Sequence, residues 1–216
     1  MNKMKKHIII ALLCLMVQAG YAQKMRDVFV AMPDSVMPYL TKVNKADCID
    51  FIDSKMRAIV KNRLDNQCEM TRLTDDYTQV KLSKGYTLEM KLLPVTDSTK
   101  IICMIRTMGD SLKQFSNIHF YTSDWKKELK RDNYIKYPKL GEYMAQRPDT
   151  ISEDGYAKLT EKIDIFLQSA TFGSDGDLTF TLNIGEMNRD DRKEVAPYIA
   201  GPICYTWNRN SFLRKN

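Results

Sequence analysis

A single stretch of alternating apolar and polar residues does most to limit what this chain can fold into. The side chains of residues 86–92 form two sets, an apolar one of Tyr86, Leu88, Met90 and Leu92 and a polar one of Thr87, Glu89 and Lys91. A period of two is typical of a β-strand that turns one face to a hydrophobic core and the other to solvent. We therefore predict a half-buried strand with Leu92 inside and with Glu89 and Lys91 in water.

The segments on either side extend this strand into a meander. Residues 79–82 alternate in the same way, and the short segment 83–85 contains a glycine, which suits a tight hairpin. Residues 101–105 are apolar on both faces, as expected of a central strand that is covered on both sides. A further apolar run lies at residues 118–122. The sequence thus predicts an antiparallel meander of four or five strands within residues 68–122.

An amphipathic helix is predicted directly before the meander, over about residues 46–64. Its apolar stripe has helical spacing and consists of Ile49, Ile52, Met56 and Ile59. Asp53 and Arg57 are four residues apart, so we expect them to form an ion pair on the exposed side. We expect this helix to cover one face of the meander, and residues 25–40 to form one or two short helical turns.

The second half of the chain predicts a smaller lobe behind an aromatic-rich connection. We expect residues 125–148 to form a long loop with one short helix near residues 139–146. Residues 159–172 fit either a helix or a strand, and we predict a strand from Ile163 onward. The remaining predicted elements are an Asp-Gly hairpin turn, a strand at 178–182, a short helix capped by Asn188 and a last strand at 203–207.

These patterns together predict an α+β fold. It combines an antiparallel β-meander and a packed amphipathic helix with a smaller C-terminal lobe of β-hairpin, helix and strand. The boundaries that follow are a signal peptide at 1–22, an N-terminal lobe at 23–124, a connection at 125–148 and a C-terminal lobe at 149–216. The alternative is one continuous domain over residues 23–216, because a chain of this length suits one large domain or two small ones.

The first 22 residues have the three-part pattern of a secretory signal peptide. A lysine cluster precedes an apolar run at residues 8–17, and Gly20 and Ala22 follow at the spacing of a cleavage site. The run is shorter than the about 20 residues of an ordinary membrane-spanning helix, and no later stretch is apolar enough to cross a membrane. We predict cleavage after Ala22, export, and no transmembrane segment in the mature chain.

Removal of this segment changes the charge balance. It takes away three of the 33 basic residues and none of the 27 acidic ones, which leaves a net charge of +3. A balance of this size serves solubility and gives no evidence for nucleic acid as a partner.

The cysteines of the mature chain do not form a metal or redox motif. Cys48, Cys68, Cys103 and Cys204 are far apart and include no CxxC pair, which excludes zinc-knuckle and thioredoxin-like sites. An exported protein can form disulfides. Cys48 and Cys68 bracket the predicted helix and are the pair to consider, with reduced thiols as the alternative. Cys103, between isoleucines, is more simply a buried apolar residue.

The ionisable residues form no recognisable catalytic or metal-binding motif. His119 is the one histidine of the mature chain, and one imidazole cannot build a His-rich metal site. The carboxylate row of the predicted helix fits a solvated face better than a cation site or an acid/base pair; it consists of Asp47, Asp50 and Asp53. Asp175 and Asp177 lack the other ligands of a calcium loop, so a hairpin turn explains them better. We predict no catalytic residue, no metal and no cofactor.

Four aromatic residues near the predicted lobe boundary are the candidate ligand site. Exposed aromatic rings often bind sugar rings or peptide, and the candidates are Trp125, Tyr134, Tyr137 and Tyr143. The alternative is that these rings seal the join between the two lobes.

Four short patches of sequence resemble a known family. They lie at residues 29–40, 92–103, 119–125 and 205–208, where the chain reads FVAMPDSVMPYL, LLPVTDSTKIIC, HFYTSDW and YTWN. Together they resemble the exported Bacteroides-type proteins grouped as domain of unknown function 3256. The resemblance spans essentially the whole mature chain. It implies an exported α+β protein of the periplasm or cell surface of a Gram-negative bacterium, and it brings no assigned activity or catalytic residue.

The leading hypothesis from the sequence is an exported non-enzymatic protein that binds or scaffolds an envelope partner, either a protein or a glycan. One alternative is an exported carboxylate-dependent hydrolase that acts on glycan or peptide, and the other is a glycan-binding module. Two facing carboxylates in a desolvated cleft would favour the hydrolase. An exposed aromatic shelf would favour the glycan-binding module.

Overall fold

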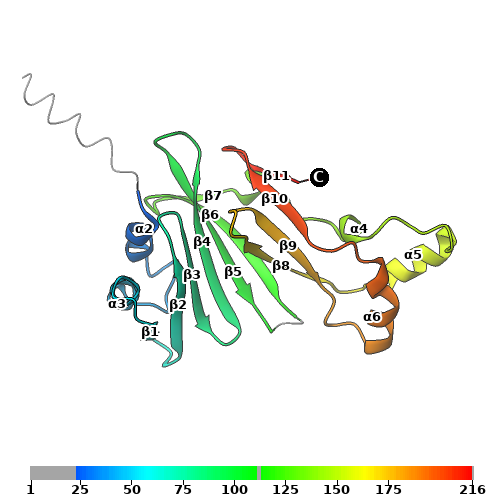
Figure 1. Ribbon diagram of the computed structural model, residues 1–216, viewed down its shortest axis with the longest axis horizontal. Coiled ribbons are helices and arrows are strands. Elements are labelled where there is room, and N and C mark those ends of the chain that lie inside the picture. Colours follow the sequence, from blue (N-terminus) through cyan, green and yellow to red (C-terminus); the bar gives the residue numbers. More distant parts are fainter. Residues whose placement is uncertain (1–22, 111–112, 216) are drawn as a thin grey trace, which may run out of the picture.

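Two antiparallel sheets and five α-helices make up the part of the chain that the computed structural model describes, residues 23–110 and 113–215 (Figure 1). The larger sheet has seven strands in chain order: β1 (Ala58–Lys61), β2 (Gln67–Leu73), β3 (Tyr77–Ser83), β4 (Tyr86–Pro94), β5 (Lys100–Met108), β6 (Phe115–Thr122) and β7 (Glu128–Leu129). The smaller sheet has the order β11-β10-β9-β8, with β8 (Leu167–Phe172), β9 (Leu178–Asn183), β10 (Ile203–Trp207) and β11 (Phe212–Arg214). The predicted α+β class is confirmed.

The seven-stranded sheet contains the predicted meander. Each strand pairs antiparallel with the next one along the chain, and in the central pair of strands Leu92 lies opposite Ile102. Leu88, Met90 and Leu92 are at most 1% exposed and pack into one core, as the alternation predicted. The sheet is wider than predicted, because β1 joins it before the meander and β7 joins it afterwards.

Helices α2 (Met25–Ala31) and α3 (Lys42–Asp53) cover this face of the sheet. A capping box fixes the start of α3. The Thr41 hydroxyl accepts a hydrogen bond from the backbone N–H of Asn44, and the Asn44 side chain accepts one from the backbone N–H of Thr41. Helix α3 therefore begins four residues earlier than the sequence predicted.

The prediction of a helix at 46–64 is wrong for its second half. Lys55 has a φ of 58°, a left-handed conformation that ends the helical run. Residues Ala58–Lys61 form β1 and pair with β2, which buries Val60, whereas Met56 from the expected apolar stripe is 57% exposed. Pairing at the edge of the sheet prevails over the helical periodicity, because β-branched residues fit a strand better than a helix.

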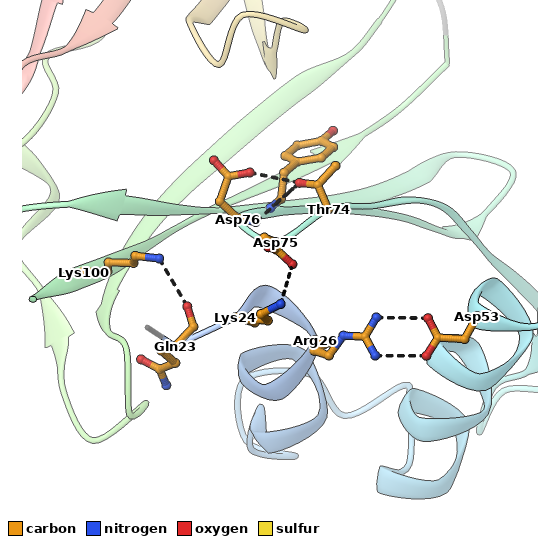
Figure 2. A network of polar contacts seen from close by, with 9 residues as sticks. Gln23, Lys24, Arg26, Asp53, Thr74, Asp75, Asp76 and Lys100 are labelled. Carbon is orange, nitrogen blue, oxygen red and sulfur yellow. Dashed lines mark hydrogen bonds and ion pairs between the residues drawn. The ribbon is translucent and has the colours of Figure 1, made fainter. Parts of the chain in front are cut away.

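The predicted ion pair between Asp53 and Arg57 does not form. Asp53 accepts two hydrogen bonds from Arg26 of α2, each at 3.0 Å between nitrogen and oxygen, as Figure 2 shows. Arg57 instead donates to Glu69 of β2. The spacing of four residues brings side chains together only on a continuous helix, and this helix has ended before Arg57. The pair of Asp53 and Arg26 joins the two helices instead.

The first described residues are tied to the sheet (Figure 2). Lys24 forms an ion pair with Asp75 in the turn between β2 and β3, at 3.3 Å. The carbonyl oxygen of Gln23 accepts a hydrogen bond from Lys100 at 3.3 Å, and its side-chain amide donates to the carbonyl oxygen of Ser123 at 2.8 Å. The chain is thus anchored from Gln23 onward. The predicted signal peptide, residues 1–22, lies outside the described residues.

A lysine is buried in the first core, which lies between the two helices and the seven-stranded sheet. Lys45 of α3 is 1% exposed, and its ammonium donates to the carbonyl oxygen of Met32. Burial lowers the pKa of Lys45 below its ordinary 10.5; Asp34 nearby raises it, and Arg63 and Lys42 add to the lowering. The folded chain therefore keeps this proton less readily than the unfolded chain does.

This burial predicts a pH dependence of stability that Lys45→Met abolishes. Below the lowered pKa of the folded state, the buried charge costs stability in full. As the pH rises toward about 10.5, the folded state loses the proton before the unfolded state does, so wild type gains stability relative to Lys45→Met. Urea unfolding of both proteins from neutral pH to about pH 10 measures this difference. A difference that stays constant over this range would contradict the prediction.

The opposite face of the seven-stranded sheet is covered by the four-stranded sheet. The second core lies between the two sheets and includes Cys103, Ile105, Ile118, Phe120, Phe172 and Phe180. Glu89, predicted to lie in water, is 4% exposed, and the Lys91 side chain is 16% exposed and paired with Asp76 at 2.8 Å. The predicted solvent face is wrong, because the sheet that covers it comes much later in the chain and leaves no local signal.

Glu89 joins the two sheets through hydrogen bonds. Its Oε1 accepts from the hydroxyl of Thr171 at 2.8 Å. Its Oε2 accepts from the hydroxyl of Tyr77 at 2.9 Å and from the backbone N–H of Phe172 at 3.0 Å. Phe172 lies on β8, an edge strand of the smaller sheet, and edge strands present N–H groups that no neighbouring strand satisfies. The Glu89 carboxylate therefore accepts a hydrogen bond from one of the N–H groups that this edge leaves unpaired.

The C-terminal half adds three α-helices, α4 (Leu140–Tyr143), α5 (Glu153–Glu161) and α6 (Arg189–Val195), and two 3₁₀ turns, η1 (Arg131–Asn133) and η2 (Ala196–Tyr198). Helix α4 lies inside its predicted range, and Asn188 caps α6 as predicted. The strand predicted from Ile163 begins only at β8 (Leu167–Phe172). Helix α5, capped by Ser152, ends at Glu161, and residues 162–166 between them form neither helix nor strand. Strand β11 was not predicted.

Candidate functional site

The structure separates the four aromatic candidates. Trp125 lies in the first core, where its indole N–H donates to the carbonyl oxygen of Val28 at 2.9 Å. Tyr143 is fully buried in the second core, and its hydroxyl donates to the side chain of Gln168 at 3.1 Å. Tyr134 and Tyr137 are half-buried beside the second core. The four rings therefore do not form one exposed shelf, and three of them pack where the two sheets meet.

Tyr134 and Tyr137 line a concave site of about 420 Å³, which we name the aromatic pocket. Its other lining residues are Asp132, Asn133, Ile135, Lys136, Lys139, Glu142, Tyr205, Ser211, Phe212, Leu213 and Arg214. The backbone N–H of Phe212 donates to the carbonyl oxygen of Tyr134 at 2.8 Å, so β11 is held against the connection. The pocket thus forms between a loop and an edge strand that lie far apart in the sequence.

Both carboxylates of the aromatic pocket are paired. Glu142 accepts from Arg214 at 2.9 Å and from the backbone N–H of Lys139 at 2.7 Å. Asp132 accepts from the neighbouring Arg131 at 2.9 and 3.0 Å. Tyr205 has its pKa raised, chiefly by burial and in addition by Glu142. Each carboxylate of the pocket is therefore bound by an arginine.

The lining of the pocket includes an exposed apolar side chain. Leu213 of β11 is 50% exposed, and Lys136 and Lys139, which also line the pocket, are exposed as well; we name these three residues the rim. The rings below are held in place, since Tyr134 packs on Phe120 with ring centroids 4.8 Å apart. The surface therefore combines fixed aromatic groups, both signs of charge and one accessible leucine.

The other candidates from the sequence lie elsewhere. His119 is stacked beside Tyr121, and its Nδ1 lies 2.8 Å from Glu128 Oε1. Asp53 is engaged by Arg26, and within residues 23–110 and 113–215 no three His, Cys, Asp or Glu side chains are grouped to hold a metal. Asp177 lies at the β8–β9 hairpin and pairs with Lys215, which lowers its pKa.

The four cysteines within the described residues are free thiols. Cys48 and Cys68 are both buried, and burial raises the pKa of Cys48 to about 12. The thiol of Cys68 donates to the carbonyl oxygen of Leu82 at 3.1 Å. Cys103 is fully buried, as expected of a small apolar residue. Thiols that are held protonated in this way are poor nucleophiles.

The half of the aromatic pocket that comes from the C-terminal strands was not predicted from the sequence. Tyr205, Phe212 and Arg214 line it from β10 and β11. The strand at 203–207 was predicted from the sequence, but no strand was predicted after it. The alternation of Phe212, Leu213 and Arg214 was the available signal, and three residues are too few for a period to be recognised.

The sequence matches the family described as "Protein of unknown function (DUF3256)" over residues 17–212. The chain belongs to this family. The resemblance inferred from the sequence is thereby confirmed, and no curated protein matches this DUF3256 chain.

A solved structure shares the fold of this DUF3256 chain. It is a domain of an uncharacterized protein from Porphyromonas gingivalis W83, similar with a TM-score of 0.75 and 21% sequence identity. The similarity covers 88% of this chain and 98% of that one. At this identity the likeness shows the fold alone. Among the described residues, no helix is long and apolar enough to cross a membrane.

Proposed function

We propose that this protein is exported and acts, without catalysing a reaction, by binding a protein of the bacterial envelope through the aromatic pocket. The observation that carries the proposal is the rim, whose half-exposed Leu213 lines the pocket together with Tyr134 and Arg214. Tyrosine and arginine are enriched among the residues that dominate protein–protein binding, and rigid rings lose little entropy on association. The pairing of Arg214 with Glu142 also presents this arginine in a fixed orientation.

The two alternatives have less support at this pocket. A carboxylate-dependent hydrolase needs a pair of acids in which one is free to donate a proton, whereas Glu142 and Asp132 are each bound by an arginine. A glycan-binding shelf needs an open ring face. Tyr205 and Phe212 are buried, and Tyr137 packs against Phe180 with ring centroids 5.2 Å apart.

Leu213→Arg tests the partner site. The mature protein, its Leu213→Arg variant and the control variant Leu64→Arg are immobilised and exposed to solubilised envelope of the source bacterium. Leu64 is 61% exposed and lies outside the pocket, so the control makes the same change at a similar exposure. We expect one partner that wild type and Leu64→Arg retain and that Leu213→Arg loses.

The dissociation constants of the three proteins for the purified partner then give the size of the effect of Leu213→Arg. We expect at least a tenfold weaker dissociation constant for Leu213→Arg, as for a residue in the centre of an interface. A partner that binds all three proteins equally well, or one that only Leu64→Arg loses, would place the interface elsewhere.

Export is a separate prediction. Cleavage after Ala22 would leave Gln23, which is held by Lys100 and Ser123, as the first residue of the mature chain. Mass spectrometry of the protein made in its own cell should find Gln23 at the N-terminus. An intact Met1 in the envelope fraction would refute the predicted cleavage.

A further inference from the structure

A second concave site lies at the junction of the two sheets. It has a volume of about 390 Å³, and we name it the polar groove. Its ten lining residues are Gln79, Thr87, Glu89, Thr107, Gln114, Ser169, Ala170, Thr171, Thr181 and Asn183. Ala170 is the one apolar residue among them, and Glu89 is the one with an ionisable side chain. The aromatic pocket shares none of these residues.

Alternation along β8 separates the polar groove from the second core. Ala170 and Phe172 point into that core, so Ser169 and Thr171 point to the other side of the strand. The floor of the groove comes from β3, β4 and β5, and its wall comes from β8 and β9. On one side of β8 the two sheets meet through apolar side chains, and on the other they face each other through polar ones.

The position of the groove is fixed by side chains that bond to β8. Ser116 accepts a hydrogen bond from the backbone N–H of Ala170 at 2.8 Å and is itself bonded to Thr107 at 2.7 Å. Glu89 holds Thr171 and the next residue along β8. The Asn183 side chain bridges Ser169 and the backbone of Gln114. These bonds hold wall and floor at a fixed separation, so the groove is preformed.

Three of the lining side chains remain available to a ligand. Within the described part of the chain, the side chains of Thr87, Gln114 and Thr181 form no hydrogen bond with protein atoms, and all three are half-buried. Polar groups inside a concave site gain from a partner that replaces bound water in a defined geometry. Hydroxyls both donate and accept, and a carboxamide does the same through its two atoms.

We propose that the polar groove is a binding site for a neutral saccharide. Sugar hydroxyls match the hydroxyl and amide groups of both walls, and a groove with a single apolar lining residue gives an apolar ligand little to contact. The Glu89 carboxylate lies at the floor as the only charge of the groove, which disfavours anionic sugars. Its oxygens accept from Thr171, Tyr77 and Phe172, so it serves the sheet junction and does not act as an acid toward the sugar.

Plugging the groove from either side tests this site. Thr87→Lys places a long side chain on the floor and Thr181→Lys places one on the wall, so the two variants are independent. Thr150→Lys makes the same change at an exposed position between α4 and α5. Thermal unfolding of each variant shows whether it is folded, and the variant that keeps its fold carries the test.

The probes are neutral trisaccharides, namely maltotriose, cellotriose, mannotriose and tri-N-acetylchitotriose, added to the isotopically labelled mature protein. We expect one of them to shift the amide signals of β4 and β9 saturably, with a dissociation constant of about 1 mM or tighter. Thr150→Lys should bind equally well, and each plugged variant should bind at least tenfold more weakly. Two results would overturn the proposal: no binding of any of the four probes, or undiminished binding by a plugged variant that is folded.

Trigalacturonate and an extended polyserine peptide are the competing probes. If either binds in the groove more tightly than every neutral trisaccharide, the ligand class is different and the proposal is wrong. The test is separate from that of the aromatic pocket, because Leu213→Arg leaves the groove unchanged and the plugged variants leave the rim of the pocket unchanged.

Discussion

Glu89→Ala should lower the free energy of unfolding by about 2–6 kcal/mol. The substitution removes the acceptor of the Tyr77 hydroxyl and of the Phe172 backbone N–H, both buried, and each orphaned buried donor costs about 1–3 kcal/mol. The Thr171 hydroxyl also loses its partner, but it is more exposed and can turn to water. Chemical denaturation with urea, followed by tryptophan fluorescence, measures the change.

Two further variants serve as comparisons for Glu89→Ala, one as a control and one as a conservative substitution. Glu186→Ala removes a carboxylate of the same kind from an exposed ion pair with Lys113, and substitutions of that type stay within about 0.5 kcal/mol. Glu89→Gln keeps one acceptor oxygen and the shape of the side chain, so its effect should fall between those of Glu89→Ala and wild type. If Glu89→Ala were as mild as Glu186→Ala, the carboxylate would not hold the sheets together.

Leu92→Ala and Ile105→Ala should each cost about 2–5 kcal/mol, through the loss of buried apolar surface and the cavity left behind. Leu92 is 1% exposed in the first core and Ile105 is fully buried in the second, so the two variants report on opposite faces of the same sheet. A typical domain has a total stability of about 5–15 kcal/mol, so either loss is a large fraction of it. The midpoint of urea unfolding is the measurement.

The matched controls are the same substitutions at exposed positions. Leu64 is 61% exposed and Ile165 is 60% exposed, so Leu64→Ala and Ile165→Ala remove the same atoms without opening a cavity. We expect both controls to stay within about 0.5 kcal/mol of wild type. A large effect of Leu92→Ala with a negligible effect of Ile105→Ala would mean that the second sheet contributes little to the stability of the first.

Helices and strands could be predicted from the sequence where the pattern depends only on residues close together in the chain. The alternation of Tyr86 to Leu92 predicted β4 and its core-facing side, since side chains in a strand alternate whatever lies above them. Asn188 was identified as the cap of α6 in the same way, because a cap needs only the backbone N–H groups of the next turn.

The prediction from the sequence was wrong where apolar residues with helical spacing belong to two different elements. Ile49, Ile52, Met56 and Ile59 have helical spacing, yet the last of them lies in β1. Helical spacing shows that apolar residues could share a face, but pairing with β2 decided the conformation of Ala58–Lys61. Edge pairing depends on a neighbouring strand, which short-range periodicity does not contain.

Burial of the second face of the seven-stranded sheet depends on long-range packing. The alternation correctly predicted that Glu89 and Lys91 lie on the other face of β4 from Leu92. It could not determine that β8 would cover that face, bury Glu89 and leave a groove beside it, because β8 is distant in the chain. Alternation fixes which side chains share a face, whereas burial of that face depends on long-range packing that no local pattern encodes.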